Sequence, residues 1–201
     1  MSLSTRMVAV LTSVGLLSGG FLAGVGLLTK ERIALNKQME IEEKISEVVP
    51  GTYSSEKFFE EKDLTVYGGK DKEGKLIGLA IHTSGMGFQD KITFMIGTNT
   101  SLTKIFSLAI LEQTETPGLG AKIDDKKSFL RFWENKDCSS VLTLRKPAVS
   151  SPAELGPSEI NTITGATISS EAILNTANSS LERVRQLIKE GKISSEGQDA
   201  N

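Results

Sequence analysis

The sequence is short of the side chains that bind metal ions and form disulfides. It contains one cysteine, Cys138, and one histidine, His82, in 201 residues. A single cysteine cannot form an intrachain disulfide, and it cannot alone hold an iron–sulfur cluster or a structural zinc ion. We interpret His82 as a strand residue rather than a ligand, and we predict no metal site. If the chain carries electrons, an organic cofactor must therefore carry them.

The sequence also lacks an excess of basic residues. It has 23 Lys and Arg against 25 Asp and Glu, a net charge of −2. Proteins that bind DNA or RNA usually present a basic face, so we predict that this chain binds no nucleic acid. Its length suits one domain with a membrane anchor, or one domain with long edges.

Long apolar runs are absent except at the N-terminus. Residues 7–28 contain no charged residue and are mostly apolar. As a helix, such a run spans about 33 Å, enough for a hydrocarbon core of ~30 Å. A cleaved signal peptide would have a shorter apolar region and a clear cleavage site with small residues. We therefore predict an uncleaved transmembrane anchor over residues 1–28, embedded in the membrane through residues 7–28.

Glycine is frequent within this apolar run. Gly15 and Gly19 form one pair of small residues at a spacing of four, and Gly20 and Gly24 form another. Such pairs let a second membrane helix approach closely. Glycine is also common in membrane helices that only anchor a domain, but we favour packing against helices of partner subunits.

The charges that flank the apolar run give a weak signal for orientation. Arg6 precedes the run, and Lys30, Arg32 and Lys37 follow it. The positive-inside rule therefore weakly places the C-terminal domain in the cytoplasm.

The rest of the chain alternates between helical and strand-like patterns. Residues 29–50 are charged and favour a stalk helix that ends at Pro50. Residues 51–192 are predicted to form one α+β domain with a mainly antiparallel sheet and packed helices. We expect strands at 64–69, 75–82, 91–96, 104–113, 140–146 and 159–163, a glycine-bearing loop at 84–88, a short helix within 124–137, a long helix at 171–190 that stops at Gly191, and a polar tail at 193–201.

One short stretch, T-G-A-T at residues 164–167, joins the last predicted strand to the last predicted helix. Ser169 or Ser170 is expected to cap that helix, because a serine hydroxyl accepts from the free N–H groups of a first turn. Gly165 leaves the backbone bare at the turn. The Thr167 hydroxyl then lies beside unsatisfied N–H groups at a helix N-terminus, which is a natural site for phosphate. From the residues alone, an ordinary capped connection stays an alternative.

A second stretch, E-T-P-G-L-G at residues 115–120, follows a predicted strand. Pro117 fixes φ, and Gly118 and Gly120 allow positive φ, so we expect a tight loop with exposed N–H groups. Such a loop can approach a planar ring or a phosphate closely. An ordinary turn is again the alternative.

The two motifs and the N-terminal membrane segment together resemble the FMN-binding domain family. Within it, the chain resembles the G subunits of Rnf-type electron-transport complexes, and the C subunits of the sodium-translocating NADH:quinone reductases are the close alternative. The family usually has an aspartate three residues before the first position of T-G-A-T, where this chain has Asn161.

The resemblance implies a covalently bound flavin. FMN would be carried by Thr167 through a phosphodiester bond, and a magnesium-dependent flavin transferase that uses FAD as the donor would attach it. The residues expected to contact FMN are Thr164, Gly165 and Ala166 in the first motif and Glu115, Thr116, Gly118 and Leu119 in the second.

The resemblance also implies a function. The chain would be a redox subunit that relays electrons during ferredoxin:NAD⁺ oxidoreduction coupled to the translocation of Na⁺ or H⁺. It would work with the other subunits, A to E, and would be no complete enzyme alone, without catalytic residues of its own. Its flavin domain would lie on the outer side of the cell membrane, opposite to the weak charge signal. An unflavinylated structural or binding subunit is the alternative, and the coupling ion, the flavin potential and the redox partners stay open.

Overall fold

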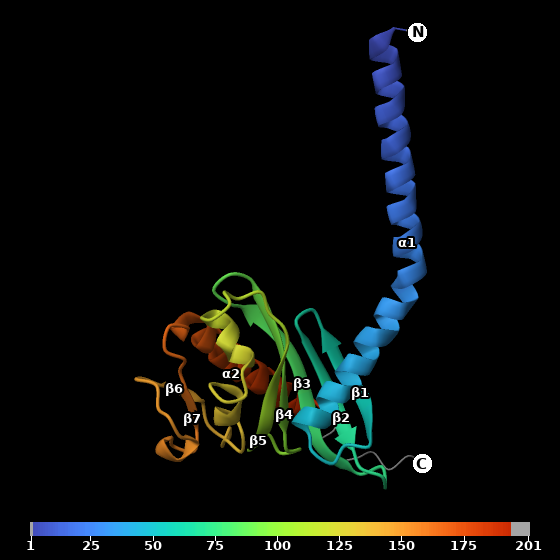
Figure 1. Ribbon diagram of the computed structural model, residues 1–201. Coiled ribbons are helices and arrows are strands. Elements are labelled where there is room, and N and C mark those ends of the chain that lie inside the picture. The colour runs from blue at the N-terminus through green and yellow to red at the C-terminus, as the bar shows by residue number, and fades with distance from the viewer. Residues whose placement is uncertain (1, 194–201) are drawn as a thin grey trace. The chain divides into compact units, whose positions relative to one another are not determined.

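The computed structural model describes residues 2–193 (Figure 1). The chain divides into two compact units, with the boundary between Glu42 and Glu43. Of the predicted polar tail, 193–201, only Ile193 lies within the described residues, and its side chain is buried.

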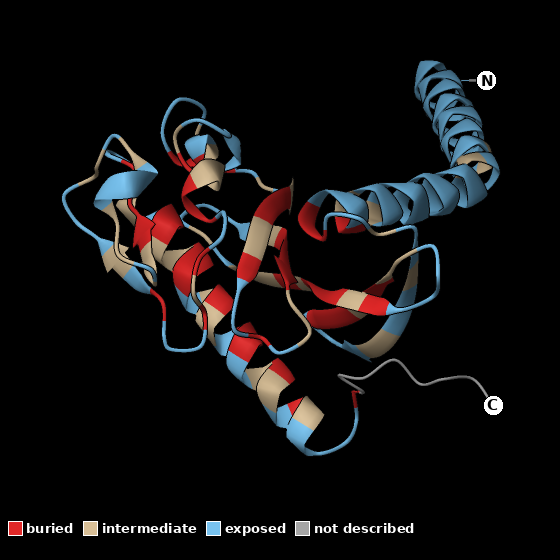
Figure 2. Cartoon of the chain, turned by 90° about the horizontal axis from the view of Figure 1, so that it is seen from below, coloured by how far each residue is buried: buried red, intermediate tan, exposed pale blue. Residues whose placement is uncertain are grey.

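The N-terminal helix, α1, runs from Leu3 to Val48 without interruption. The predicted anchor and stalk are thus one helix, which ends two residues before Pro50, as expected for a helix that meets a proline. Its apolar segment is long and apolar enough to cross a membrane, and its side chains are exposed, as Figure 2 shows by the pale blue colour. An apolar helix that protein does not cover suits a lipid environment.

The central sheet has five strands, each antiparallel to its neighbours and in sequence order. The strands are β1 (Ser54–Glu61), β2 (Leu64–Lys70), β3 (Leu76–Met86), β4 (Lys91–Thr98) and β5 (Ile105–Glu112). The sequence predicted the last four. It missed β1, an edge strand with no buried side chain, so the alternation that marks a half-buried strand is absent there.

The loop expected at residues 84–88 is wrong in its first half. Strand β3 continues to Met86, and Ser84, Gly85 and Met86 pair in register with β4. Gly85 serves close packing rather than a turn. A Cβ atom there would lie 2.0 Å from Oγ1 of Thr176 on the helix that covers this face.

That helix, α2 (Thr167–Lys189), lies across one face of the sheet (Figures 1 and 2). Its apolar residues recur at helical spacing and form one buried stripe. The stripe consists of Ile173, Leu174, Ala177, Leu181, Val184 and Leu187. The predicted stop is confirmed, because Glu190 is the C-cap and Gly191 adopts a φ of +69°.

The last turn of α1 packs on the opposite face of the sheet. Val48 and Val49 are fully buried there, against glycines of the central strands. A Cβ atom at Gly97 would lie 1.8 Å from the Val48 carbonyl oxygen, and one at Gly78 would lie 2.7 Å from a Val49 methyl group. The compact unit therefore includes a turn that the sequence assigned to the stalk.

The segment between β5 and α2 forms a second, smaller layer. It comprises the 3₁₀ helices η1 (Gly120–Asp124), η2 (Leu130–Phe132) and η3 (Pro152–Glu154) and the parallel strands β6 (Thr143–Arg145) and β7 (Glu159–Asn161). The short helix expected within 124–137 is present only as the three-residue 3₁₀ helix η2. The Asp125 carboxylate accepts from the backbone N–H and hydroxyl of Ser128, at 2.7 and 2.5 Å, and this bonding favours a turn over a continuous helix.

The aromatic residues of this segment are core residues, as predicted. Phe129, Phe132 and Trp133 are all buried, and the rings of Phe129 and Trp133 meet edge to face with centroids 6.0 Å apart. Their burial fixes the small layer against the sheet.

Candidate functional site

The T-G-A-T stretch forms the turn between β7 and α2. Gly165 adopts a φ of +84°, a conformation that other residues rarely tolerate, and α2 begins at Thr167 with Ala166 as its N-cap. The expected serine cap is wrong, because Ser169 and Ser170 lie inside the first turn of the helix. No side chain caps this helix. Its first N–H groups are therefore available to an anion.

Five hydroxyl groups lie close to this turn, and their exposure separates them. Ser169, Ser170 and Thr162 are buried. Thr164 is exposed and Thr167 is partly exposed, and neither hydroxyl makes a hydrogen bond within residues 2–193. Of these five residues, only Thr164 and Thr167 are thus accessible to a reagent from solvent.

The E-T-P-G-L-G stretch forms the predicted tight loop between β5 and η1. Gly118 has a φ of +78°, which confirms the expectation for that glycine. Gly120 does not adopt a positive φ. It is required for another reason, because a Cβ atom there would lie 2.4 Å from the Glu115 carboxylate.

The fold brings the two motifs together, although about fifty residues separate them in the chain. Leu119 lies against the turn, since a Cβ atom at Gly165 would be 3.3 Å from its methyl group. The Glu115 carboxylate, almost fully buried, accepts a hydrogen bond of 2.6 Å from the Ser169 hydroxyl. Thr116 accepts from the Gln89 side chain at 2.8 Å.

A cleft of about 660 Å³ opens between the two motifs and the small layer. Gly118 and Thr164 are the predicted site residues that line it, whereas Thr167 lies on the helix side of the turn. Its other lining residues are Pro117, Ala121, Lys122, Asp125, Lys127, Ser128, Arg131, Phe132, Ala148, Val149, Asn161, Thr162 and Ile163.

Cationic side chains dominate the charge at this cleft. Lys122, Lys127 and Arg131 face one acid, Asp125. The Ser128 hydroxyl and backbone N–H donate to that carboxylate and hold the pKa of Asp125 below its ordinary value, so it stays ionised at neutral pH. The Arg131 guanidinium donates to the Ser150 carbonyl oxygen at 2.6 Å and lies 4.7 Å from the centre of the Phe132 ring. The sequence did not indicate these cations as site residues, because a run of charged residues is typical of a solvent-exposed surface.

Asn161 fixes one wall of the cleft. Its buried side-chain amide donates to the Val149 carbonyl oxygen and accepts from the Val149 N–H, both at 2.9 Å. An aspartate could accept but could not donate. The asparagine that departs from the family pattern thus has a local structural role.

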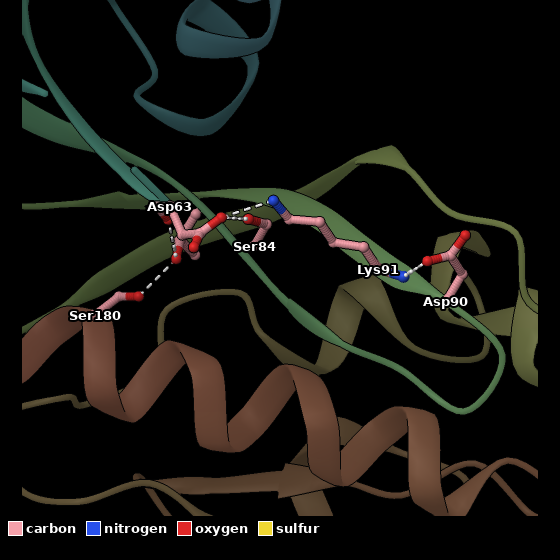
Figure 3. A network of polar contacts seen from close by, with 6 residues as sticks. Asp63, Ser84, Asp90, Lys91 and Ser180 are labelled. Atoms are coloured by element: carbon pink, nitrogen blue, oxygen red, sulfur yellow. Dashed lines mark hydrogen bonds and ion pairs between the residues drawn. The ribbon is translucent and has the colours of Figure 1, made fainter. Parts of the chain in front are cut away.

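A second cleft, of about 580 Å³, lies along the middle of α2. Some of its polar groups are paired with one another or with neighbouring residues (Figure 3). Thr83 and Ser180 share a hydrogen bond of 2.8 Å, and Asp63 accepts from Lys91 at 2.7 Å and from Ser84 at 3.2 Å. Within the described residues, no group of three His, Cys, Asp or Glu side chains could hold a metal ion here or elsewhere.

The region that carries both motifs is similar to a known protein family. Residues 87–182 match the FMN-binding domain family. The chain is similar to the G subunit of an ion-translocating oxidoreductase complex from Methanosarcina acetivorans, with 22% identity over 90% of this chain and 94% of that protein. It is also similar to the G subunit of a proton-translocating ferredoxin:NAD⁺ oxidoreductase complex from Clostridium ljungdahlii, with 25% identity over 87% of this chain and 88% of that protein.

Solved structures share the fold. NqrC from Shewanella oneidensis superposes with a TM-score of 0.52 at 18% identity, over 68% of this chain and 72% of that one. The C subunit of a Na⁺-translocating NADH-quinone reductase from Parabacteroides distasonis gives 0.50 at 22% identity, over 62% of each chain. The turn and the cleft thus lie within the region, residues 87–182, that is similar to the FMN-binding domain family.

Proposed function

We propose that the chain is the G-type subunit of a membrane complex that couples ferredoxin:NAD⁺ oxidoreduction to ion translocation. In this role it relays electrons through an FMN that is linked to Thr167. Two relatives that match most of the chain are named as G subunits, one of an ion-translocating oxidoreductase complex and one of a proton-translocating ferredoxin:NAD⁺ oxidoreductase complex, which supports this role over that of the quinone-reductase subunit.

One observation carries the proposal. Thr167 is the first residue of a helix that no side chain caps; the residue is partly exposed, and its hydroxyl makes no hydrogen bond in the described chain. A phosphate on this hydroxyl would accept from the free N–H groups of the first turn, where the helix dipole also favours negative charge. Thr164 is reachable too, but it precedes these N–H groups.

The residues around the turn fit FMN. The bare turn at Gly165 and the positive φ of Gly118 keep side chains away from a ring that approaches the backbone. Leu119, half exposed, offers an apolar surface beside the attachment turn, and the cleft supplies the positive charge of Arg131 and Lys122. When bound, FMN supplies the uptake and release of electrons, and the protein positions it.

Attachment needs an outside enzyme, because a threonine hydroxyl is a weak nucleophile at its own pKa. With FAD as the donor, the Thr167 oxygen forms a bond to the phosphorus of the FMN half and loses its proton. The bond between that phosphorus and the bridging oxygen breaks, and AMP leaves. The linkage runs through phosphate, so the ring system stays chemically unmodified.

The N-terminal helix would place the chain in the membrane beside partner subunits. Its glycines have no protein atom near the position of an added Cβ, so this surface is open to other helices. Replacing Gly19 and Gly20 by leucine would keep the helix apolar but block close approach. We expect partner subunits to co-purify less with this double variant, while its insertion into the membrane is unchanged.

Intact mass and a denatured absorption spectrum test the attachment. The chain, produced together with a flavin transferase, should carry the mass of FMN less water and keep a flavin band in denaturant. Thr167→Ala should lose both signals. A fluorescent band from Thr167→Ala in a denaturing gel would show that FMN is attached elsewhere.

The proposed outer location of the flavin domain is tested with a membrane-impermeant thiol reagent. Cys138 is unsuitable as a target, because burial raises the pKa of its thiol to about 11 and its side chain is inaccessible. Lys72→Cys, in an exposed turn between β2 and β3, should react in intact cells. Reaction only after lysis would place the domain in the cytoplasm.

A further inference from the structure

The Glu115 carboxylate is the most deeply buried acid near the proposed site. Only 4% of the residue is exposed, and no ion pair involves it within residues 2–193. A buried carboxylate is costly unless hydrogen bonds compensate the lost water. The structure provides two donors, the Ser169 hydroxyl at 2.6 Å from Oε2 and the Gln89 backbone N–H at 3.0 Å from Oε1.

These two bonds join three separate segments. Gln89 lies in the turn between β3 and β4, Glu115 begins the loop of the second motif, and Ser169 lies in the first turn of α2, two residues after Thr167. The Gln89 side chain adds a further bond to Thr116 of the same loop. One side chain thus sets the distance between the second motif and the start of α2.

The backbone around the carboxylate is shaped to hold it. A Cβ atom at Gly87 would lie 2.4 Å from Oε1, and one at Gly120 would lie 2.4 Å from Oε2. Both distances are too short for a real contact, so a side chain at either position would displace the carboxylate. Two glycines from different segments therefore leave the space that the Glu115 carboxylate occupies.

We propose that Glu115 is a positioning residue, which holds the helix start with Thr167 in register with the loop of the second motif and does not itself contact the cofactor. Both carboxylate oxygens already have donors from the protein, and burial leaves little surface for a ligand. The effect of Glu115 on the flavin rests on the proposed function. The bridge between the three segments is a property of the chain without cofactor.

The test uses the full-length chain in detergent without flavin, and hydrogen–deuterium exchange as the readout. Glu115→Ala should speed exchange about tenfold in peptides that cover residues 86–90 and 167–172, because both tethers are lost. A tenfold change corresponds to about 1.4 kcal/mol in the local opening free energy. Glu115→Gln should stay near the parent chain. Its amide oxygen can accept from Gln89, and its amide nitrogen can donate to the Ser169 oxygen.

Two variants separate the bridge from general damage. Ser169→Ala should speed exchange at the helix start and leave residues 86–90 unchanged. Glu73→Ala removes an exposed carboxylate in a distant turn and should change neither peptide. Exchange in Glu115→Ala as slow as in the parent chain would overturn the proposal. Exchange in Glu115→Gln as fast as in Glu115→Ala would also overturn it.

A second measurement, on flavin-loaded chain, distinguishes this proposal from the proposed function. Glu115→Ala should keep the covalent mass increment but show lower fluorescence anisotropy of the flavin, since the attachment turn has become mobile. A changed flavin spectrum with unchanged exchange would instead make Glu115 a direct contact. Absence of any covalent flavin on the parent chain would refute attachment at Thr167 and leave the exchange result standing.

Discussion

Two clefts of similar size can be compared, one of about 660 Å³ beside the turn that precedes α2 and one of about 580 Å³ at the middle of α2. Both are rich in hydroxyl groups. At the middle cleft, Thr83 is bonded to Ser180, and Asp63 to Lys91. Beside the first cleft, the start of α2 is uncapped, and the hydroxyls of Thr164, which lines the cleft, and Thr167, which begins the helix, have no partner among the described residues.

The difference lies in the free N–H groups at the start of α2 rather than in volume, because Asn175, Thr176 and Ser179 at the middle cleft also have no side-chain partner among the described residues. Polar groups that already bond to one another gain little from a ligand, because binding would exchange one hydrogen bond for another. Free N–H groups at a helix start gain a full charge-assisted bond when an anion arrives. We therefore propose the binding role for the first cleft, and three substitution pairs and one single substitution test this assignment.

The largest contrast is expected between Thr167→Ala and Thr176→Ala. Thr167 begins the helix, and Thr176 lines the middle cleft. The first substitution should abolish covalent flavin, and the second should leave it intact, as should Thr164→Ser. In-gel fluorescence after denaturation measures all three. Loss of the band in Thr176→Ala would give the middle cleft a part in attachment and break the comparison.

A smaller contrast is expected between Gly118→Val and Gly74→Val. The two glycines have φ values of +78° and +82°, and no atom lies near the Cβ position of either. Valine at such a φ costs on the order of 1–3 kcal/mol at both positions. Thermal unfolding should therefore report similar losses. Only Gly118→Val should also shift the absorption spectrum and potential of the bound flavin. A flavin spectrum in Gly118→Val equal to that of the parent chain would show that Gly118 does not contact the flavin.

Asparagine clamps provide a third pair. Asn161 bonds twice to the backbone of Val149, and Asn178 bonds twice to that of Leu142, all four distances being 2.9 Å. Aspartate loses the donor in either case, with an expected cost of about 1–3 kcal/mol. Both variants should unfold at lower temperature, and only Asn161→Asp should alter flavin fluorescence, because its clamp forms a cleft wall. Covalent attachment should persist in both, and its loss in Asn161→Asp would extend the role of this residue to maturation.

The smallest effect is expected at the middle cleft. The hydrogen bond from Lys91 lowers the pKa of Asp63 from its ordinary 3.8. A lowered folded-state pKa means that this carboxylate stabilises the fold above its unfolded pKa, and that the contribution disappears as the pH falls through the folded value. Because the pair is exposed, Asp63→Asn should lower the unfolding temperature slightly at pH 7, and the difference should vanish in strong acid. A flavin signal that changed with this variant would contradict the assignment of the clefts.

The elements with strong periodicity could be predicted from the sequence. Strands β2 to β5 and the buried stripe of α2 follow from alternation and helical spacing, and the exposed edge strand β1 carries neither pattern. The start of α2 was placed too late, because Ser169 and Ser170 look like caps. Their hydroxyls serve tertiary contacts instead, with Glu115 and with the backbone of the turn.

The motifs of the candidate site could be found from the sequence, but their mutual geometry could not. The role of Gly120 depends on a carboxylate five residues away and on a helix far along the chain. The cations Lys122 and Arg131 lie in a charged segment whose fold is set by the Asp125 turn and the buried aromatic residues. Such long-range relations leave no local pattern in the sequence.

The burial of Ile45, Val48 and Val49 has a practical consequence for producing the domain in water. These three side chains are fully inaccessible, and each fully buried aliphatic side chain is worth roughly 1.5–3 kcal/mol. A truncated protein that starts at residue 51 would expose the glycine-lined surface at Gly78 and Gly97. The free energy of unfolding that this truncated protein loses would approach the whole stability of an ordinary domain, about 5–15 kcal/mol. A soluble version should therefore begin before Ile45, with the last turn of the membrane helix retained as part of the fold.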